Sequence, residues 1–294
     1  MAPSDDPSAS VWSGNPMPIT RSAKITGLAI AGSAVALLAA KSVARSPKEE
    51  SAVGKAVTFP PLNTLKAVAD DIWIVDSGPI RPGGVFLPIR MTILRLGNGD
   101  LMLHSPTELT EALVEELKAL GPVRHLIAPN IAHWTLLAAW QDRFPDALTW
   151  GAPGLRDRAQ VRASALRIDR DLREEAPADW RGEVDQGLVC GAGFSEVYFF
   201  HRASHTLVLT DVVQHLPADR SSLWTRAFVL LSGAYAGTTP RYLRAILRMR
   251  QRQVASSFDQ MLKLAPERVI FAHGEWFVRD GANRLRAALG WFER

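Results

Sequence analysis

Three histidines and one aspartate each follow an apolar run that is typical of a β-strand: His104 after residues 101–103, His133 after 123–130, Asp211 after 206–210, and His273 after 269–272. Side chains at the ends of strands in α/β folds point into the crevice beyond the sheet, where ligands bind. Two imidazoles and one carboxylate from separate strand ends suit Zn²⁺, Fe²⁺ or Mn²⁺. The pattern therefore predicts His133, Asp211 and His273 as ligands of one divalent metal. A lone histidine at a strand end is more often structural, so the prediction rests on the whole set, and a metal-free protein stays open.

Two other histidines are candidates for moving protons. His104 and His205 lie beside the predicted strand ends. Imidazole is the side chain that ordinarily titrates near neutral pH, which suits general acid–base catalysis. We therefore expect His104 and His205 to be the catalytic residues if the protein is an enzyme.

The elements that must position these residues begin with a β-hairpin. Residues 90–96 and 101–105 are apolar runs joined by Gly97-Asn98-Gly99-Asp100, and Asn-Gly supplies the positive φ values of a tight turn. A helix then runs to about Leu120, with Thr107 or Thr110 as its cap, and Gly121-Pro122 ends it.

The rest of the chain alternates strands with helices. Apolar periodicity predicts strands at 72–75, 123–128, 149–152, 196–200, 206–210 and 269–272, and helices at 132–144, 222–236, 241–264 and 279–292. Such an order favours a layered α/β domain with sheets sandwiched between helices.

These motifs, taken in order, resemble a known superfamily. They are Arg90-Met91-Thr92, His104-Ser105-Pro106, Pro129-Asn130 with His133, His201 through Asp211, and His273-Gly274. The series resembles the metallo-β-lactamase-like superfamily and, more narrowly, domain-of-unknown-function family 4336 (DUF4336), over roughly residues 62–292. The resemblance implies a four-layer αββα sandwich, a hydrolytic active site, and His133, Asp211 and His273 as its second metal site.

Departures from the superfamily pattern are as informative as the matches. Its central motif is His-x-His-x-Asp-His, whereas the corresponding stretch here is Pro129-Asn130-Ile131-Ala132-His133-Trp134. No histidine stands near 190–193, where the resemblance implies another ligand. The first of the two metal sites is therefore expected to be lost, and His104 replaces a frequent aspartate.

The N-terminal part has a different composition. Residues 1–24 are polar and predicted to be disordered, 25–45 contain a charge-free run at 25–40, 46–61 form a linker, and 62–294 form the domain. The charge-free run is short for a transmembrane helix. It is either a membrane anchor, a cleaved signal peptide with a site at Ser42-Val43-Ala44, or a helix lying on a surface. We expect a membrane-associated or exported protein, on a side of the membrane that the flanking positive charges leave open.

The net charge and the cysteine content limit the binding partners and the covalent crosslinks that the chain can have. A formal net charge of +4 is too small to favour nucleic acid, and the single cysteine, Cys190, excludes an internal disulfide. Arg241, Arg244, Arg248 and Arg252 share one face of a predicted helix. That stripe is either a solvated face paired with acidic neighbours or a contact for anionic lipid headgroups.

Three functions remain open from the sequence. The leading hypothesis is a membrane-associated protein with one metal or a vestigial site, acting as a hydrolase on an unknown small molecule. The first rival is a metal-free binding or scaffold domain of the same fold. The second is a peripheral lipid-binding protein that uses the arginine stripe.

Overall fold

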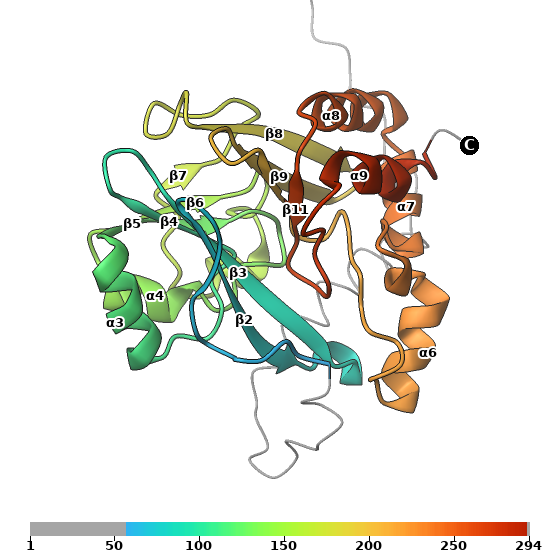
Figure 1. Cartoon of the computed structure of the whole chain (residues 1–294), viewed down its shortest axis with the longest axis horizontal. Helices are drawn as coiled ribbons and strands as arrows, with labels where there is room; N and C mark the ends of the chain where they lie inside the picture. The colour runs from blue at the N-terminus through green and yellow to red at the C-terminus, as the bar shows by residue number, and fades with distance from the viewer. Residues whose placement is uncertain (1–56, 293–294) are drawn as a thin grey trace, which may run out of the picture.

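The computed structural model describes residues 57–292 as two β-sheets that face each other between two groups of helices (Figure 1). The larger sheet has seven strands in the order of the chain, β1-β2-β3-β4-β5-β6-β7, and the smaller has the order β11-β10-β9-β8. The strands are β1 (Lys66–Ala69), β2 (Ile72–Ile80), β3 (Leu87–Arg95), β4 (Leu101–His104), β5 (Val123–Ala128), β6 (Leu148–Gly151), β7 (Arg170–Asp171), β8 (Val184–Gly191), β9 (Phe194–His201), β10 (Thr206–Val208) and β11 (Arg268–Ile270). Both sheets are mixed, because β4 to β7 are parallel neighbours and β10 is parallel to β11.

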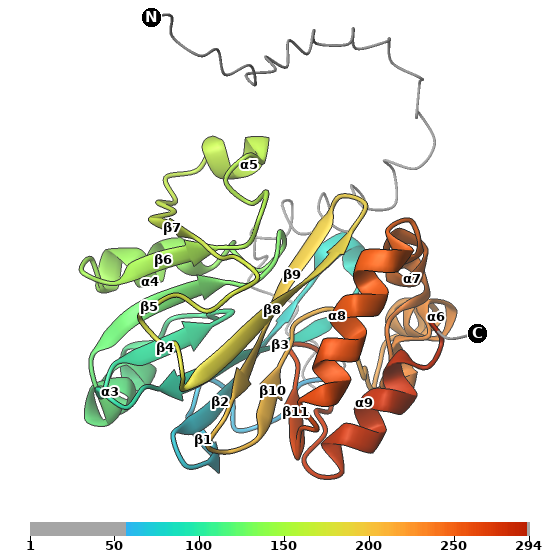
Figure 2. The same ribbon diagram turned by 90° about the horizontal axis from the view of Figure 1, so that it is seen from above.

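The helices surround the two sheets, as the two views of the ribbon show (Figures 1 and 2). They are α3 (Glu111–Leu120), α4 (Leu137–Arg143), α5 (Ala159–Arg162), α6 (Leu223–Ser232), α7 (Arg241–Arg248), α8 (Gln251–Lys263) and α9 (Gly281–Leu289), with short 3₁₀ turns at Pro82–Gly84 and Ala234–Ala236. The helices α3 and α4 cover the larger sheet, and α7, α8 and α9 cover the smaller one.

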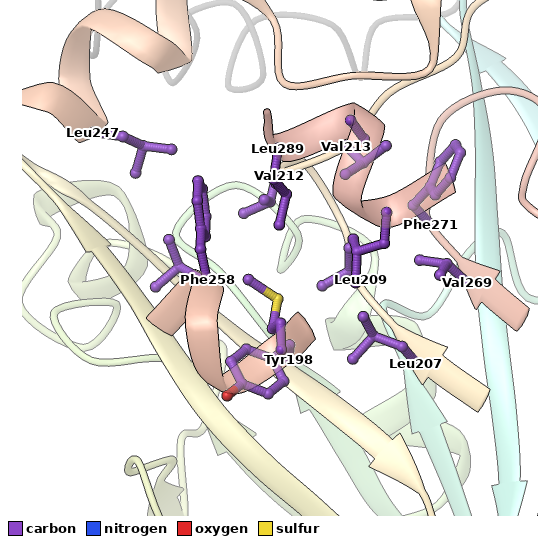
Figure 3. Packing of buried hydrophobic residues seen from close by; sticks show 14 of the residues in the cluster. Tyr198, Leu207, Leu209, Val212, Val213, Leu247, Phe258, Val269, Phe271 and Leu289 are labelled. Atoms are coloured by element: carbon purple, nitrogen blue, oxygen red, sulfur yellow. The ribbon is translucent and has the colours of Figure 1, made fainter. Parts of the chain in front are cut away.

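The domain has four layers, in the order helices, sheet, sheet, helices, and an apolar layer of side chains lies between each neighbouring pair. The outer two apolar layers are sheet–helix cores, one around Leu103, Leu117 and Trp140 and one around Phe200, Phe258 and Leu285. In the second of these, side chains from β9 and β10 interdigitate with those of α8 and α9 (Figure 3). The middle layer, which includes Ile127 and Phe199, joins the two sheets face to face. The four-layer arrangement expected from the sequence therefore holds for the described residues.

The predicted hairpin is confirmed. β3 pairs antiparallel with β4, and the backbone N–H of Gly99 donates to the carbonyl of Leu96 across the turn. Gly99 has a φ of +89°, which L-residues adopt only at a cost. The helix cap is settled as well, because the Thr110 hydroxyl accepts from the N–H of Leu113 at the start of α3.

Two helices differ from the prediction. The single helix expected at 241–264 is two, because the backbone at Arg250 leaves the helical region (φ −123°, ψ 44°). The Ile246 carbonyl, which Arg250 would use in a continuous helix, instead accepts from Ala192 at the β8–β9 turn. The helix expected at 132–144 begins only at Leu137, after a series of turns.

The strand β8 was absent from the sequence prediction. Gly187 in its middle lies opposite Tyr198 of β9, and a Cβ there would fall 2.2 Å from the tyrosine oxygen. The phenol thus occupies the space that a side chain would fill. A glycine in the middle of a strand also interrupts the apolar alternation from which strands are predicted.

The predictions for residues 1–24 and 25–45, including the N-terminal hydrophobic helix, lie outside the described residues. The predicted linker, 46–61, overlaps them at 57–61, where Val57 and Thr58 are buried. No helix between residues 57 and 292 combines the length and apolar character needed to cross a membrane.

One buried ion pair ties the larger sheet to the loop after β11. A guanidinium nitrogen of Arg90 on β3 lies 2.6 Å from Asp76 on β2, and both side chains are almost fully buried. The other terminal nitrogen of Arg90 donates to the carbonyls of Phe271 and Gly274, at 2.9 Å and 2.8 Å. Arg90 therefore holds the segment that carries His273 against the larger sheet.

We predict that Arg90→Ala destabilises the protein by about 3 kcal/mol, because it leaves two carbonyls without their donor and the buried Asp76 carboxylate with Lys66 as its remaining cation. The matched control is Arg95→Ala. Its ion pair with Asp71 has the same 2.6 Å separation, but both side chains are more than a third exposed, so its loss is expected to cost less than about 1 kcal/mol. Urea unfolding measures both, and equal losses would contradict the role assigned to burial.

Candidate metal centre

The candidate site lies where the ends of strands from both sheets meet. β4 and β5 are parallel neighbours, so Ser105 and Asn130, which follow them, lie at one edge of the larger sheet. β10 and β11 are parallel in the smaller sheet, so Asp211 and His273 follow them at the same edge of that sheet. A backbone bridge between Asn130 and Glu196 of β9 joins the two edges.

The structure brings together the three residues predicted as ligands. One possible donor atom from each of His133, Asp211 and His273 lies within 4.8 Å of the others. The Nε2 atom of His133 is 3.3 Å from one oxygen of Asp211, and Nε2 of His273 is 3.3 Å from the other. Among the described residues, this is the one cluster of three or more such groups at metal-binding range.

Each imidazole is held through its other nitrogen. Nδ1 of His273 lies 2.8 Å from the carbonyl of Pro88, which can only accept, so this nitrogen carries the proton. Nδ1 of His133 lies 2.7 Å from the Ser105 hydroxyl. Nε2 of His273 is therefore left free to bind a metal, and Ser105 fixes the orientation of His133.

Asp211 is oriented by two side-chain amides. Asn130 donates to one of its oxygens at 2.7 Å and Gln214 to the other at 3.0 Å. The side-chain oxygen of Asn130, Oδ1, also accepts from the backbone N–H groups of Ala132 and His133. One buried amide thus positions both the carboxylate and the turn that carries His133, and this turn explains why α4 starts late.

Glu196 holds the backbone of the loop that carries Asp211. Its carboxylate is fully buried and accepts from the N–H groups of Thr210, Asp211 and Val212. Burial, and then the charge of Asp211, raises the pKa of Glu196, while these backbone hydrogen bonds oppose the rise. Every donor that it meets suits the ionised form.

The electrostatics of the cluster favour a negative Asp211. Burial alone would raise its pKa, but His133 and His273 outweigh burial and hold the pKa of Asp211 well below its ordinary value. Burial would likewise lower the pKa of His273, yet its bond to Asp211 raises it. In the metal-free protein a proton shared with Asp211 therefore competes with any cation for Nε2 of His273.

The two histidines predicted as catalytic lie in very different surroundings. His104 is 1% exposed, packs edge-on against Phe199, and its Nε2 has no hydrogen-bond partner among the described residues. Burial, and then the neighbouring His133, lowers the pKa of His104 to about 3, so it stays neutral near pH 7. His205 precedes β10, at the opposite end of that strand from Asp211. His104 is thus closed to solvent and His205 lies away from the three predicted ligands, and the catalytic role of each stays a prediction.

The sequence reasoning missed the residues that support the cluster. These are Ser105, Asn130, Glu196 and Gln214. Glu196 had a readable signal, since a carboxylate inside the apolar run from Phe194 to His201 must find buried donors. Gln214 had none, because its partner is known only once the loop is folded.

A family model decides which family the chain belongs to. The model described as "Domain of unknown function (DUF4336)" matches residues 69–233, which is more than half of the chain. The chain belongs to the DUF4336 family. The matched region includes His133 and Asp211 and ends before His273.

Solved structures show the fold of this DUF4336 protein. A metallo-β-lactamase from Pontibacter korlensis is similar over 79% of this chain and 99% of its own, with 14% identity and a TM-score of 0.51. The metallo-β-lactamase FIM-1 from Pseudomonas aeruginosa, in its mono-zinc form, gives 78% and 94%, 14% identity and 0.51. The metal-soaked Flv1 flavodiiron core from Synechocystis sp. PCC6803 gives 78% and 60%, 12% identity and 0.57.

These likenesses establish a metallo-β-lactamase fold, as the sequence resemblance implied. No curated protein matches the sequence significantly. Substrate and chemistry must therefore be argued from the DUF4336 chain itself.

We predict that His104 makes the protein unstable in acid. Its pKa is about 3 in the folded state against 6.5 ordinarily, so below pH 6.5 the unfolded chain binds a proton that the folded chain does not. Stability is then lost as pH falls, by about 1.4 kcal/mol per pH unit. His104→Leu should be about as stable as the wild type at pH 7 and about 2 kcal/mol more stable at pH 5.

Urea unfolding at several pH values measures this slope. His205→Gln is the control, because that side chain is exposed and lies at the far end of β10. If His104→Leu and the wild type lose stability in parallel between pH 7 and pH 5, the neutral state assigned to His104 is contradicted.

Proposed function

We propose that this DUF4336 protein is a hydrolase-like member of the metallo-β-lactamase fold with a single metal site, made by His133, Asp211 and His273. The observation that carries the proposal is that the three donor atoms converge within 4.8 Å. Each belongs to a side chain that a further hydrogen bond holds in place. Two histidines and a carboxylate suit Zn²⁺, Fe²⁺ or Mn²⁺. FIM-1, which shares the fold, has been solved with one zinc.

The second site of the two-metal arrangement is proposed to be absent. Where the superfamily motif has its early histidines, this chain has Pro129 and Ile131, whose side chains offer no ligand atom. The side chain of Asn130, which stands between them, is engaged with Asp211 and the following turn. An amide nitrogen that donates to the carboxylate supports that carboxylate but cannot bind a cation.

When bound, one divalent ion supplies a water of lowered pKa and polarises a substrate oxygen. The chain's own groups would orient the site: Ser105 and Pro88 fix the imidazoles, and Asn130 and Gln214 fix the carboxylate. His104 stays neutral and buried, so proton transfer falls to solvent or to the substrate.

A metal-free binding domain is the second candidate, and one observation favours it. Asp211 already has four polar side chains within 3.3 Å, so its charge is compensated by Asn130, Gln214 and the two histidines. A carboxylate with that many partners is stable without a cation.

The stoichiometry of bound metal separates the two candidates. We expect the full chain, purified in mild detergent and loaded with Zn²⁺, Fe²⁺ or Mn²⁺, to hold about one equivalent by elemental analysis, the geometry allowing one ion. Asp211→Asn and His273→Ala should each lose it, while His205→Ala keeps it. A wild-type chain that stays metal-free and is equally stable with and without chelator would favour the binding domain.

We also predict that Ser105→Ala lowers metal affinity about 10- to 100-fold, because the hydroxyl fixes the imidazole of His133. The control is Ser204→Ala. Ser204 makes the same kind of contact with His201, 2.9 Å against 2.7 Å, away from the cluster. Competition with a chromophoric chelator measures both affinities, and an unchanged value for Ser105→Ala would exclude His133 as a ligand held in this way.

Membrane association through residues 25–40 is proposed on the sequence alone. The charge-free run flanked by Lys24 and Lys41 supports an anchor or an export signal. Detergent dependence of the full chain, set against an N-terminally processed form, distinguishes the anchor from the signal.

A further inference from the structure

Helix α6 presents an apolar face to solvent, which is the reverse of an ordinary surface helix. Leu223, Trp224 and Leu231 are 88%, 65% and 74% exposed. Together with Ala227 and Leu230 they occupy one continuous arc of roughly 120° around the helix, since successive residues are about 100° apart. Arg226 lies directly beside this arc.

The helix is firmly docked by its opposite face, so the exposed arc is a fixed feature. Val229 and Ser232 are buried, and the Thr225 hydroxyl accepts from the N–H of Phe86 at 3.0 Å. The indole N–H of Trp224 donates to the carbonyl of Gly83 at 3.4 Å. The polar atom of Trp224 is thereby engaged, and its ring carbons remain in water.

The chain around α6 carries positive charge without any negative charge. No Asp or Glu occurs between residues 220 and 258, and seven arginines do: Arg220, Arg226, Arg241, Arg244, Arg248, Arg250 and Arg252. Within residues 57–292, Arg220 alone of these has a carboxylate within 4.0 Å. Others bind backbone carbonyls, such as Arg241 to Leu231 and Arg248 to Trp291, which leaves their charge uncompensated.

The helices α6 and α7, which carry the apolar arc and four of these arginines, lie on one side of the molecule. α6 and α7 follow each other along the same side in both views, with α3 on the opposite side (Figures 1 and 2). Met249, between α7 and α8, adds another exposed apolar side chain next to Arg248 and Arg250. The surface formed by α6, α7 and the start of α8 is therefore both apolar and basic.

We propose that this α6–α7 surface lies on an anionic lipid bilayer, with the exposed arc of α6 inserted among the headgroups. Leucine and tryptophan flanked by arginine are the composition of helices that lie in the membrane interface. A helix of ten residues is roughly 15 Å long, half the thickness of the hydrocarbon core, so α6 lies in the surface and does not span it. Phosphate headgroups would neutralise the unpaired arginines.

A second copy of the chain fits the same surface less well. In a two-fold dimer the patch meets itself, so each arginine would face the arginines of the partner. Such a contact buries like charges with no carboxylate from residues 220–258 to compensate them. Charge complementarity therefore favours the lipid surface.

The test follows the environment of α6 in the full chain, so that attachment through residues 25–40 cannot imitate it. In a Cys190→Ser background, Ala227→Cys places an environment-sensitive nitrobenzoxadiazole label on the exposed arc. Ala119→Cys, on an exposed position of α3, is the matched control on the opposite side. Each labelled chain is mixed with vesicles of phosphatidylcholine, with or without phosphatidylglycerol, and with doxyl-lipid quenchers.

We expect the label at 227 to shift to the blue and to be quenched on vesicles with phosphatidylglycerol, while the label at 119 is unchanged. Arg226→Gln and Arg241→Gln should each reduce the docked fraction about fivefold relative to the free one, from the usual contribution of one arginine at an anionic surface. A label at 227 that stays in water on these vesicles overturns the proposal. So does a blue shift that appears without vesicles and grows with protein concentration, since this would show a dimer.

Discussion

A carboxylate that no solvent reaches holds the loop on which the candidate metal centre is built. Glu196 accepts the backbone N–H groups of three successive residues, 210 to 212, just after β10 ends. Buried N–H groups must find acceptors, and a strand that ends inside the protein leaves several without a sheet partner. Because Glu196 supplies them all, the chain can turn there and present the side chain of Asp211 at a fixed place.

The other members of the site depend on that turn. Asn130 reaches Asp211 from the larger sheet, and the same amide fixes the turn of His133. Arg90 fixes the segment of His273 from the opposite direction by holding two carbonyls on either side of it. Three residues that are far apart in sequence are thus each placed by a buried polar group that carries no catalytic chemistry.

Whether a feature depends on local sequence or on contacts between distant residues decides how far the sequence could predict the structure. The hairpin at 97–100, a helix cap at Thr107 or Thr110 and the layered α/β fold follow from local rules of turn chemistry and periodicity, and the structure bears them out, with Thr110 as the cap. The split between α7 and α8 could not be predicted, because the Ile246 carbonyl is taken by Ala192, which is distant in sequence. The strand β8 could not be predicted for a similar reason. Gly187 interrupts its sequence pattern, and the Tyr198 ring that fills the space beside this glycine comes from another strand.

At the site the same distinction separates the predicted ligands from the two histidines predicted as catalytic. His133, Asp211 and His273 lie together because strand ends converge, which is a property of the fold. The catalytic role expected of His104 and His205 rests on residue type and nearness to a strand end, whereas the chemistry of imidazole depends on how the side chain is buried. His104 follows a strand like the others, yet its ring turns into the layer between the sheets against Phe199. A strand end thus places a residue at the edge, whereas the packing of the two sheets decides whether its side chain meets the crevice or the core.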